Sequence, residues 1–296
     1  MPESNARQGV LFAISAYTMW GIAPLFFKQL VDIPAPEILI HRIMWSFLLL
    51  FGLLVAMRRL SNTVAVLRNP KQLCVLALTS VLLGGNWLLF IWAVNNDHLL
   101  DASLGYYINP LLNVALGMMF LSERLRRLQW FAVALALTGV VIQLVSFGSF
   151  PVIAFTLAIS FGIYGLLRKK LNVDAMSGLL LESLILLPFA LGYWIFFADS
   201  SYADMTNNAW NMNTLLIAAG AVTTAPLLCF IAAAQRLKYS TLGFFQYIGP
   251  SLMFILAVSL YGEVFTAEKA VTFGFIWAAL VVFSFDGIRN NRKKKA

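Results

Sequence analysis

The chain has 296 residues, of which 60% are hydrophobic and 11% are charged, and its formal net charge is +8. Soluble domains average about 25% charged residues, so the composition excludes an ordinary water-soluble globular protein. The two cysteines, Cys74 and Cys229, lie far apart in the sequence and support neither a structural disulfide nor a metal site. These features indicate an all-α protein that crosses a membrane several times.

Apolar runs without charge recur along the whole chain, as in residues 47–57 and 133–145. A bilayer core about 30 Å thick is crossed by about 20 apolar helical residues, and these runs lack the alternation of a transmembrane β-strand. Gaps that are polar, charged or rich in proline predict ten transmembrane helices. In chain order they lie near residues 8–28, 37–57, 72–95, 103–121, 128–147, 150–167, 178–198, 213–235, 241–261 and 269–288.

The segments outside these helices are short. The longest connections, 58–71 and 199–212, leave no room for an inserted soluble domain. The first apolar segment is too long for the apolar part of a cleaved signal peptide, so it is expected to remain as a membrane anchor.

The distribution of basic residues predicts how the helices are oriented. With the N-terminus in the cytoplasm, 18 of the 21 basic residues fall on the cytoplasmic side, and the exceptions are Lys28, Arg42 and Lys269. Positive residues favour cytoplasmic loops, so both termini are expected in the cytoplasm. The basic tail RNNRKKKA then helps to orient the last helix, although nucleic-acid binding is a second interpretation of its charge. We expect the lipid bilayer, and no nucleic acid, as a partner.

An internal repeat relates the two halves of the sequence. LGYYINPLLNVALGMMFLSE (104–123) and LGFFQYIGPSLMFILAVSLYGE (242–263) share a Leu-Gly start, two aromatics and a proline followed thirteen residues later by glutamate. The preceding helices also match at an offset of 140, as in Phe90 and Phe230. We therefore predict two repeats of five helices each, residues 1–148 and 149–296.

Five helices is an odd number, so the second repeat must cross the membrane upside down. The connection SERLRRLQ is basic, while its counterpart GEVFTAEK is mostly acidic, as opposite sides of a membrane require. Inverted repeats are typical of secondary transporters, whose solute site lies near the midplane beside helices interrupted by glycine or proline. Residues 103–113 and 241–250 are predicted to be such a pair.

The paired helices, together with Trp20-Gly21 and Tyr164-Gly165, resemble the EamA family of the drug/metabolite transporter superfamily. The segments EILIHRIMWSF, GGNWLLFIWAVNN, ASLGYYINPL and TLGFFQYIGP are similar to the RarD-type permeases, which are linked with chloramphenicol sensitivity or resistance. This resemblance covers nearly the whole chain and implies a multi-pass permease of the bacterial inner membrane. It leaves amino acids, metabolites and drugs open as solutes.

Four ionisable residues fall within or at the end of predicted helices, where charge is costly unless it serves a cavity or a partner. Lys28 can extend to the outer interface. Arg42 suits an anionic group or a salt bridge with Glu37 or Asp32. His41 and Glu182 are the candidates for carrying a coupled proton, and the alternative for Glu182 is an ion pair with Arg168 or Lys169.

Further candidates for the solute pathway are amide and aromatic side chains within the helices. Amides in lipid need hydrogen-bond partners, so they either line the pathway or join helices. Aromatic side chains can form an apolar cavity wall or face lipid. The pathway candidates of both kinds are Trp20, Asn86, Tyr106, Asn109, Asn113, Tyr164, Gln246 and Tyr247.

These observations favour a secondary transporter that exports small organic solutes by alternating access, driven by protons or by the membrane potential. A passive channel is the alternative, and it would need a continuous polar lining. An intramembrane enzyme is a distant third, because the chain has two histidines and no nucleophile motif or acid pair. The sequence also lacks a Walker-type phosphate loop, and no cofactor is expected. A homodimer stays open as a partner.

Overall fold

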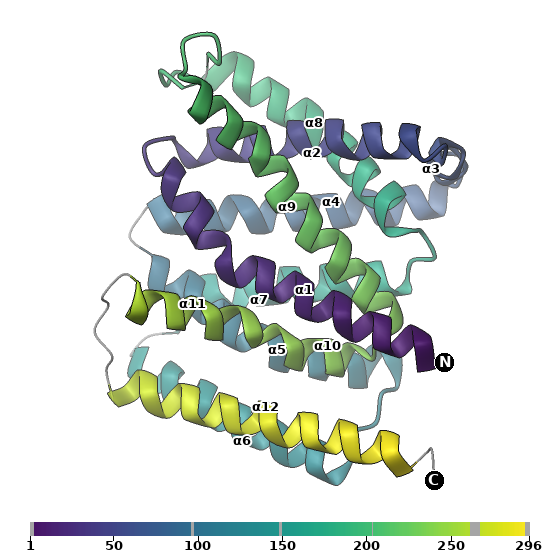
Figure 1. The fold of residues 1–296 in the computed structure, drawn as a ribbon, viewed down its shortest axis with the longest axis vertical. Helices are drawn as coiled ribbons and strands as arrows, with labels where there is room; N and C mark the ends of the chain where they lie inside the picture. Colours follow the sequence, from purple (N-terminus) through teal and green to yellow (C-terminus); the bar gives the residue numbers. More distant parts are fainter. Residues whose placement is uncertain (1–2, 96–97, 148–149, 203, 261–266, 294–296) are drawn as a thin grey trace.

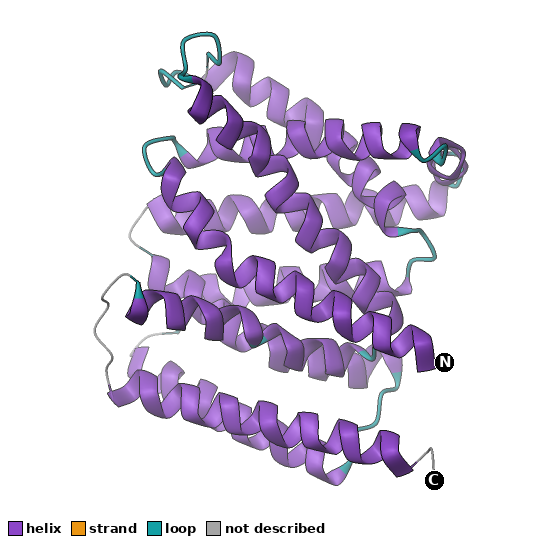
Figure 2. Cartoon of the chain, in the orientation of Figure 1, coloured by secondary structure: helices purple, strands orange, loops and turns teal. Residues whose placement is uncertain are grey.

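A computed structural model describes residues 3–95, 98–147, 150–202, 204–260 and 267–293, and in these ranges the chain is helical with short connections (Figures 1 and 2). The first half contains α1 Glu3–Phe27, the 3-10 turn η1 Lys28–Leu30, α2 Ala35–Ala56, α3 Leu60–Leu67, α4 Pro70–Asn95, α5 Leu99–Leu121 and α6 Arg127–Phe147. The second half contains α7 Val152–Lys170, α8 Ala175–Phe197, α9 Trp210–Arg236, α10 Tyr239–Gln246, α11 Ile248–Ser259 and α12 Ala267–Lys293.

Nine helices in the described ranges are long and apolar enough to cross a membrane. They lie where nine of the ten predicted helices were placed. The remaining one, predicted at 241–261, is divided into α10 and α11 at Tyr247. Ten membrane crossings therefore describe the fold, with one of them in two pieces.

The interruption expected in both repeats occurs in one of them. Pro250 follows the break at Tyr247, and its ring nitrogen cannot donate the hydrogen bond that would continue the helical ladder. Pro110 lies inside the continuous helix α5, so the prediction of a broken helix at 103–113 was wrong. The structure therefore has one interrupted helix rather than a matched pair. Glu263, the predicted counterpart of Glu123 in the second repeat, lies outside the described residues.

The helices of the two halves pack against each other in reciprocal pairs (Figure 1). Helix α1 packs on α9, and α7 packs on α4; likewise α2 packs on α8, and α6 on α12. The counterparts of α1, α2, α4 and α6 in the second half are α7, α8, α9 and α12. When each helix is exchanged for its counterpart, the same four pairs of neighbours result. This is the packing expected of two inverted halves, and we propose residues 148 and 149 as their boundary.

The predicted loop 58–71 contains the short helix α3, which the sequence interpretation did not include. Arg58 adopts the left-handed conformation, with φ of 55°, and ends α2. The Thr63 hydroxyl then lies 3.1 Å from the Ser177 hydroxyl and joins α3 to the start of α8. The loop is therefore ordered against the bundle.

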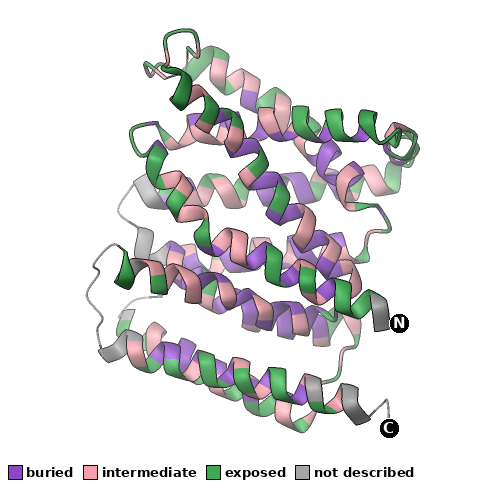
Figure 3. Cartoon of the chain, in the orientation of Figure 1, coloured by how far each residue is buried: buried purple, intermediate pink, exposed green. Residues whose placement is uncertain are grey.

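Buried positions lie along the inward sides of the helices, and exposed positions face outward (Figure 3). The largest core cluster joins α1, α7, α9 and α10 around Tyr17, Tyr164 and Phe230. Trp130, on α6, is among many large apolar side chains that stay exposed. Such an exterior is suited to lipid rather than to water.

Candidate functional site

A small cavity lies between α2, α4, α8 and α9. Its volume of about 10 Å³ is room for about one water. The wall combines aliphatic side chains with hydroxyls, one indole and one carboxylate: Ile43, Ser46, Leu50, Leu83, Trp87, Leu179, Glu182, Ser183, Leu186, Thr223, Thr224 and Leu227. The four helices come in equal number from the two halves, as expected for a site between inverted repeats.

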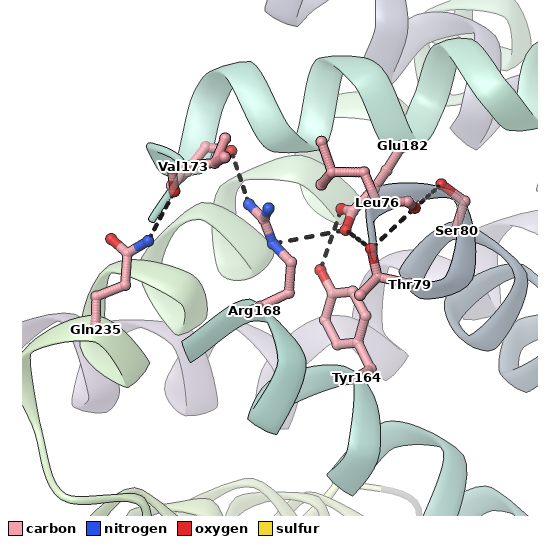
Figure 4. A network of polar contacts seen from close by, with 9 residues as sticks. Leu76, Thr79, Ser80, Tyr164, Arg168, Val173, Glu182 and Gln235 are labelled. Atoms are coloured by element: carbon pink, nitrogen blue, oxygen red, sulfur yellow. Dashed lines mark hydrogen bonds and ion pairs between the residues drawn. The ribbon is translucent and has the colours of Figure 1, made fainter. Parts of the chain in front are cut away.

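The carboxylate of Glu182 lies in the N-terminal part of α8 and is almost fully buried. Its Oε1 accepts a hydrogen bond of 2.6 Å from the Thr79 hydroxyl of α4. Its Oε2 lies 3.4 Å from the Tyr164 hydroxyl of α7. Figure 4 shows these groups converging on Glu182 from separate helices.

Arg168, on α7, supplies the positive charge beside this carboxylate. Its Nε lies 3.5 Å from Oε1 of Glu182, and both side chains are buried. Its Nη2 donates to the carbonyl oxygen of Ala175 at 3.5 Å, while Nε and Nη1 have no hydrogen-bond partner among the described residues. The pair therefore neutralises two buried charges through a long contact, with guanidinium donors left over.

The ion pair between Arg168 and Glu182 is the alternative that the sequence left open for Glu182. Lys169 instead donates to the carbonyl oxygens of Ala234 and Leu237, and so joins α7 to the end of α9. The two neighbouring basic residues thus have different partners.

Arg42 of α2 lies behind the cavity wall and contacts two of the residues that form it. Its Nε donates a hydrogen bond of 2.7 Å to the hydroxyl of Thr223, the middle residue of α9. Its guanidinium carbon lies 4.7 Å from the ring centre of Trp87 and 5.2 Å from that of Phe27. Thr223 and Trp87 are both cavity walls, so the guanidinium points into the bundle and is stabilised partly by aromatic rings.

The salt bridge of Arg42 with Glu37 or Asp32 is not formed. Glu37 instead accepts hydrogen bonds from the backbone and the hydroxyl of Ser200, in the connection between α8 and α9. In the described part of the chain, no carboxylate lies within salt-bridge distance of Arg42.

Arg42 and Glu182 occupy equivalent positions in the two repeats. They are 140 residues apart (182 − 42), which is also the offset between Phe90 and Phe230. Each lies seven residues after the start of its helix, at Ala35 or Ala175. The inverted repeat thus places opposite charges at equivalent positions around one cavity.

His41 lies apart from this cavity, although it is adjacent to Arg42 in sequence. Its buried ring lies 6.4 Å from the ring of Trp194 on α8, and Nδ1 has no hydrogen-bond partner among the described residues. One helical position turns its side chain toward a different neighbour. His41 is therefore not brought together with Glu182.

The amide candidates join helices instead of lining the cavity. Asn113 donates to Gln246 Oε1 at 2.9 Å and to Asn109 Oδ1 at 3.1 Å. Asn109 donates to the carbonyl oxygen of Ala158 at 2.6 Å, so the three amides connect α5, α7 and α10. Asn86 donates to the carbonyl oxygen of Leu157 at 2.9 Å and joins α4 to α7.

The aromatic candidates fall into separate places. Trp20 packs 5.8 Å from Phe230, in the cluster that contains Tyr164. Tyr247 is buried at the break between α10 and α11 and donates to the carbonyl oxygen of Tyr107 at 3.3 Å. Tyr106 is 37% exposed and contacts Phe90. Among these four, Tyr164 alone touches the polar network at Glu182.

Sequence reasoning missed most of the cavity wall. Ser46, Ser183, Thr223 and Thr224 line it, yet hydroxyls are common in membrane helices and often bond their own backbone. Ser46 does donate to a carbonyl, but that of Gly220 on α9, at 3.1 Å. The offset of 140 that relates Arg42 to Glu182 is the signal that could have located the two charged residues.

The chain is similar to known transporters along its whole length. Residues 7–145 match the EamA-like transporter family. An uncharacterized transporter of Vibrio cholerae is 62% identical over 287 residues, covering 97% of this chain and 95% of that protein. Protein RarD of Salmonella typhi is 58% identical over 294 residues, covering 99% of this chain and 100% of that protein.

The fold is also similar to a solved structure. A chain of known crystal structure superposes with a TM-score of 0.74 at 19% identity, covering 95% of this chain and 98% of that one. At this level of identity the likeness shows the shared fold.

Proposed function

Since this chain belongs to the EamA-like transporter family and is a RarD-type permease, we propose that it is a secondary active exporter of small organic metabolites or drugs. In this proposal, residues 1–148 and 149–296 form the two halves that open in turn to each side of the membrane. Chloramphenicol-related and amino-acid-like solutes are the first classes to test. Both termini lie in the cytoplasm of a bacterial cell, and the site faces the periplasm after opening outward.

The observation that carries the proposal is the cavity between the two halves, with the buried carboxylate of Glu182 in its wall and the half-buried guanidinium of Arg42 beside it. Four helices, two from each half, enclose it. Buried charge within a membrane is costly and is usually retained where a pathway needs it. The cavity now holds about one water, so a solute enters only when the surrounding helices separate.

Glu182 is the proposed coupling residue. It faces the cavity and also binds α4 and α7 through Thr79, Tyr164 and Arg168. A proton on its carboxylate removes the negative charge and weakens the attraction to Arg168. Protonation is thereby linked to the contact between α7 and α8, which is what coupling requires.

The test is a timed profile of intracellular and extracellular solutes, with a chloramphenicol load included. Cells overexpress the intact protein, lack the gene, or carry Glu182→Gln. We expect at least one solute to leave faster with the intact protein, and Glu182→Gln to slow its export and remove the dependence on the proton gradient.

Glu37→Gln is the matched control, because Glu37 is a buried carboxylate of α2 whose partner is Ser200. It should retain gradient dependence at equal protein abundance. Unchanged flux and pH dependence in Glu182→Gln would reject Glu182 as the coupling residue. If export by the intact protein does not depend on the proton gradient, the protein is instead a passive facilitator.

A further inference from the structure

The charges around the cavity do not balance. Arg168 and Glu182 neutralise each other. Arg42 has no carboxylate partner in the described ranges, and its neighbours are the Thr223 hydroxyl, two aromatic rings and the phenol of Tyr106. The site therefore carries about one unit of uncompensated positive charge, which a bound anion would compensate within a medium of low dielectric.

The guanidinium of Arg42 is held in an orientation that suits an anion. Nε is occupied by Thr223, while none of the described residues accepts a hydrogen bond from the two terminal nitrogens. Trp87 and Phe27 contact the planar group through their rings. Two parallel N–H donors at the end of an arginine match the two oxygens of a carboxylate.

Thr223 fixes this orientation through its own hydrogen-bond direction. Its hydroxyl donates to the carbonyl oxygen of Ala219 at 2.7 Å, so a lone pair faces Nε of Arg42. The donor and the acceptor roles of the hydroxyl are both used. Valine at this position would keep the shape and lose the acceptor.

We propose that the transported solute is an organic monoanion whose carboxylate binds the terminal nitrogens of Arg42. This rests on the proposed function. A single uncompensated charge favours a monoanion over a dianion such as a phosphate ester. Ser46, Ser183 and Thr224 line the cavity whose wall Arg42 contacts through Thr223 and Trp87. These hydroxyls offer hydrogen bonds to the rest of the solute, between aliphatic walls.

Purified protein in lipid vesicles tests the proposal with matched pairs of compounds. The probes are N-acetyl amino acids with aromatic, aliphatic and polar side chains, and the corresponding N-acetyl amides, which lack the negative charge. Accumulation is measured by mass spectrometry and corrected with vesicles that lack protein. We expect the carboxylate of at least one pair to exceed its amide by about tenfold or more, the value of a hydrogen bond to a charged group.

Arg42→Gln should abolish the preference for the carboxylate, Arg42→Lys should retain part of it, and Thr223→Val should raise the half-saturating concentration of the carboxylate. Arg236→Gln is the control, since Arg236 also lies over a phenylalanine ring, that of Phe12, but this ring is not part of the cavity wall. It should keep the preference. Thr223→Val keeps the charge of Arg42, so this variant still tests the role of Arg42 in carboxylate binding if Arg42→Gln does not fold.

Equal accumulation of amides and carboxylates, or a carboxylate preference that persists in Arg42→Gln, overturns the inference and leaves the proposed function standing. The inference is also overturned if neither member of any pair accumulates and the solute found in the cell-wide profile is uncharged. A profile in which no solute depends on the intact protein rejects the proposed function itself.

Discussion

Gly178 of α8 provides the space in which Arg168 lies. A Cβ atom built at this glycine would come within 2.2 Å of Nη1 and 2.4 Å of Nη2. The guanidinium is fully buried, so it has no alternative position in water. Because the side chain of Gly178 is only a hydrogen atom, the Arg168 guanidinium has room to form its ion pair with Glu182.

Gly178→Ala should destabilise the protein by about 1–3 kcal/mol, because the added methyl must displace a packed guanidinium or part the two helices. The measurement is the free energy of unfolding of the purified protein in detergent. Gly192→Ala is the matched control on the same helix, where nothing lies within 4 Å of the new Cβ. Equal stability of the two variants would contradict the tight fit at Gly178.

At the scale of elements, Glu123 joins the end of α5 to the start of α10. Its carboxylate accepts hydrogen bonds from the backbone nitrogens of Tyr239 and Ser240, at 2.6 and 2.9 Å, and from the Ser240 hydroxyl at 2.6 Å. Ser122, with φ of 52°, ends α5 and directs the next residue back toward α10. A carboxylate at a helix N-terminus satisfies free N–H groups and complements the helix dipole. Glu123 thus holds the two halves together.

Glu123→Gln should lower the free energy of unfolding by about 1–3 kcal/mol, because the amide keeps one acceptor and loses the charge. Chemical denaturation of the detergent-purified protein measures this. Asp32→Asn, at an exposed acidic position, should change little. If both variants unfold alike, the carboxylate does not stabilise the junction between α5 and α10.

At the scale of the molecule, inversion of the second half sets which surfaces lie on each side. The connection between α8 and α9 and the short helix α3 should lie on opposite sides of the membrane, because α2 and α8 are inverted counterparts. Because positive residues such as Arg58 and Arg68 lie near α3, we expect that side in the cytoplasm.

Labelling with a membrane-impermeant thiol reagent tests this orientation. In a background in which Cys74 and Cys229 are replaced by serine, Ser201→Cys should react in intact cells. Asn62→Cys, in α3, should react only after the membrane is permeabilised. Both positions are exposed in the structure, so accessibility does not bias the comparison. The reverse labelling pattern would contradict the predicted cytoplasmic location of α3 and of both termini.

The sequence by itself determined the membrane class, the positions of the helices and the family. Hydrophobic length and charge act locally along the chain, so a single sequence displays them directly. The repeat also indicated that Arg42 and Glu182 occupy related points. It did not show that Pro110 stays within a helix while α10 and α11 separate near Pro250, because neighbouring helices decide whether a broken ladder is satisfied.

The tertiary structure alone decided which polar side chains meet. Asn109, Asn113 and Gln246 bond one another across helices, while Thr223 meets Arg42 over a separation of 181 residues. Burial does not fix a partner, because an amide or a hydroxyl on a helix faces whichever neighbour the packing brings. The cavity, its hydroxyls and its unbalanced positive charge follow from that packing.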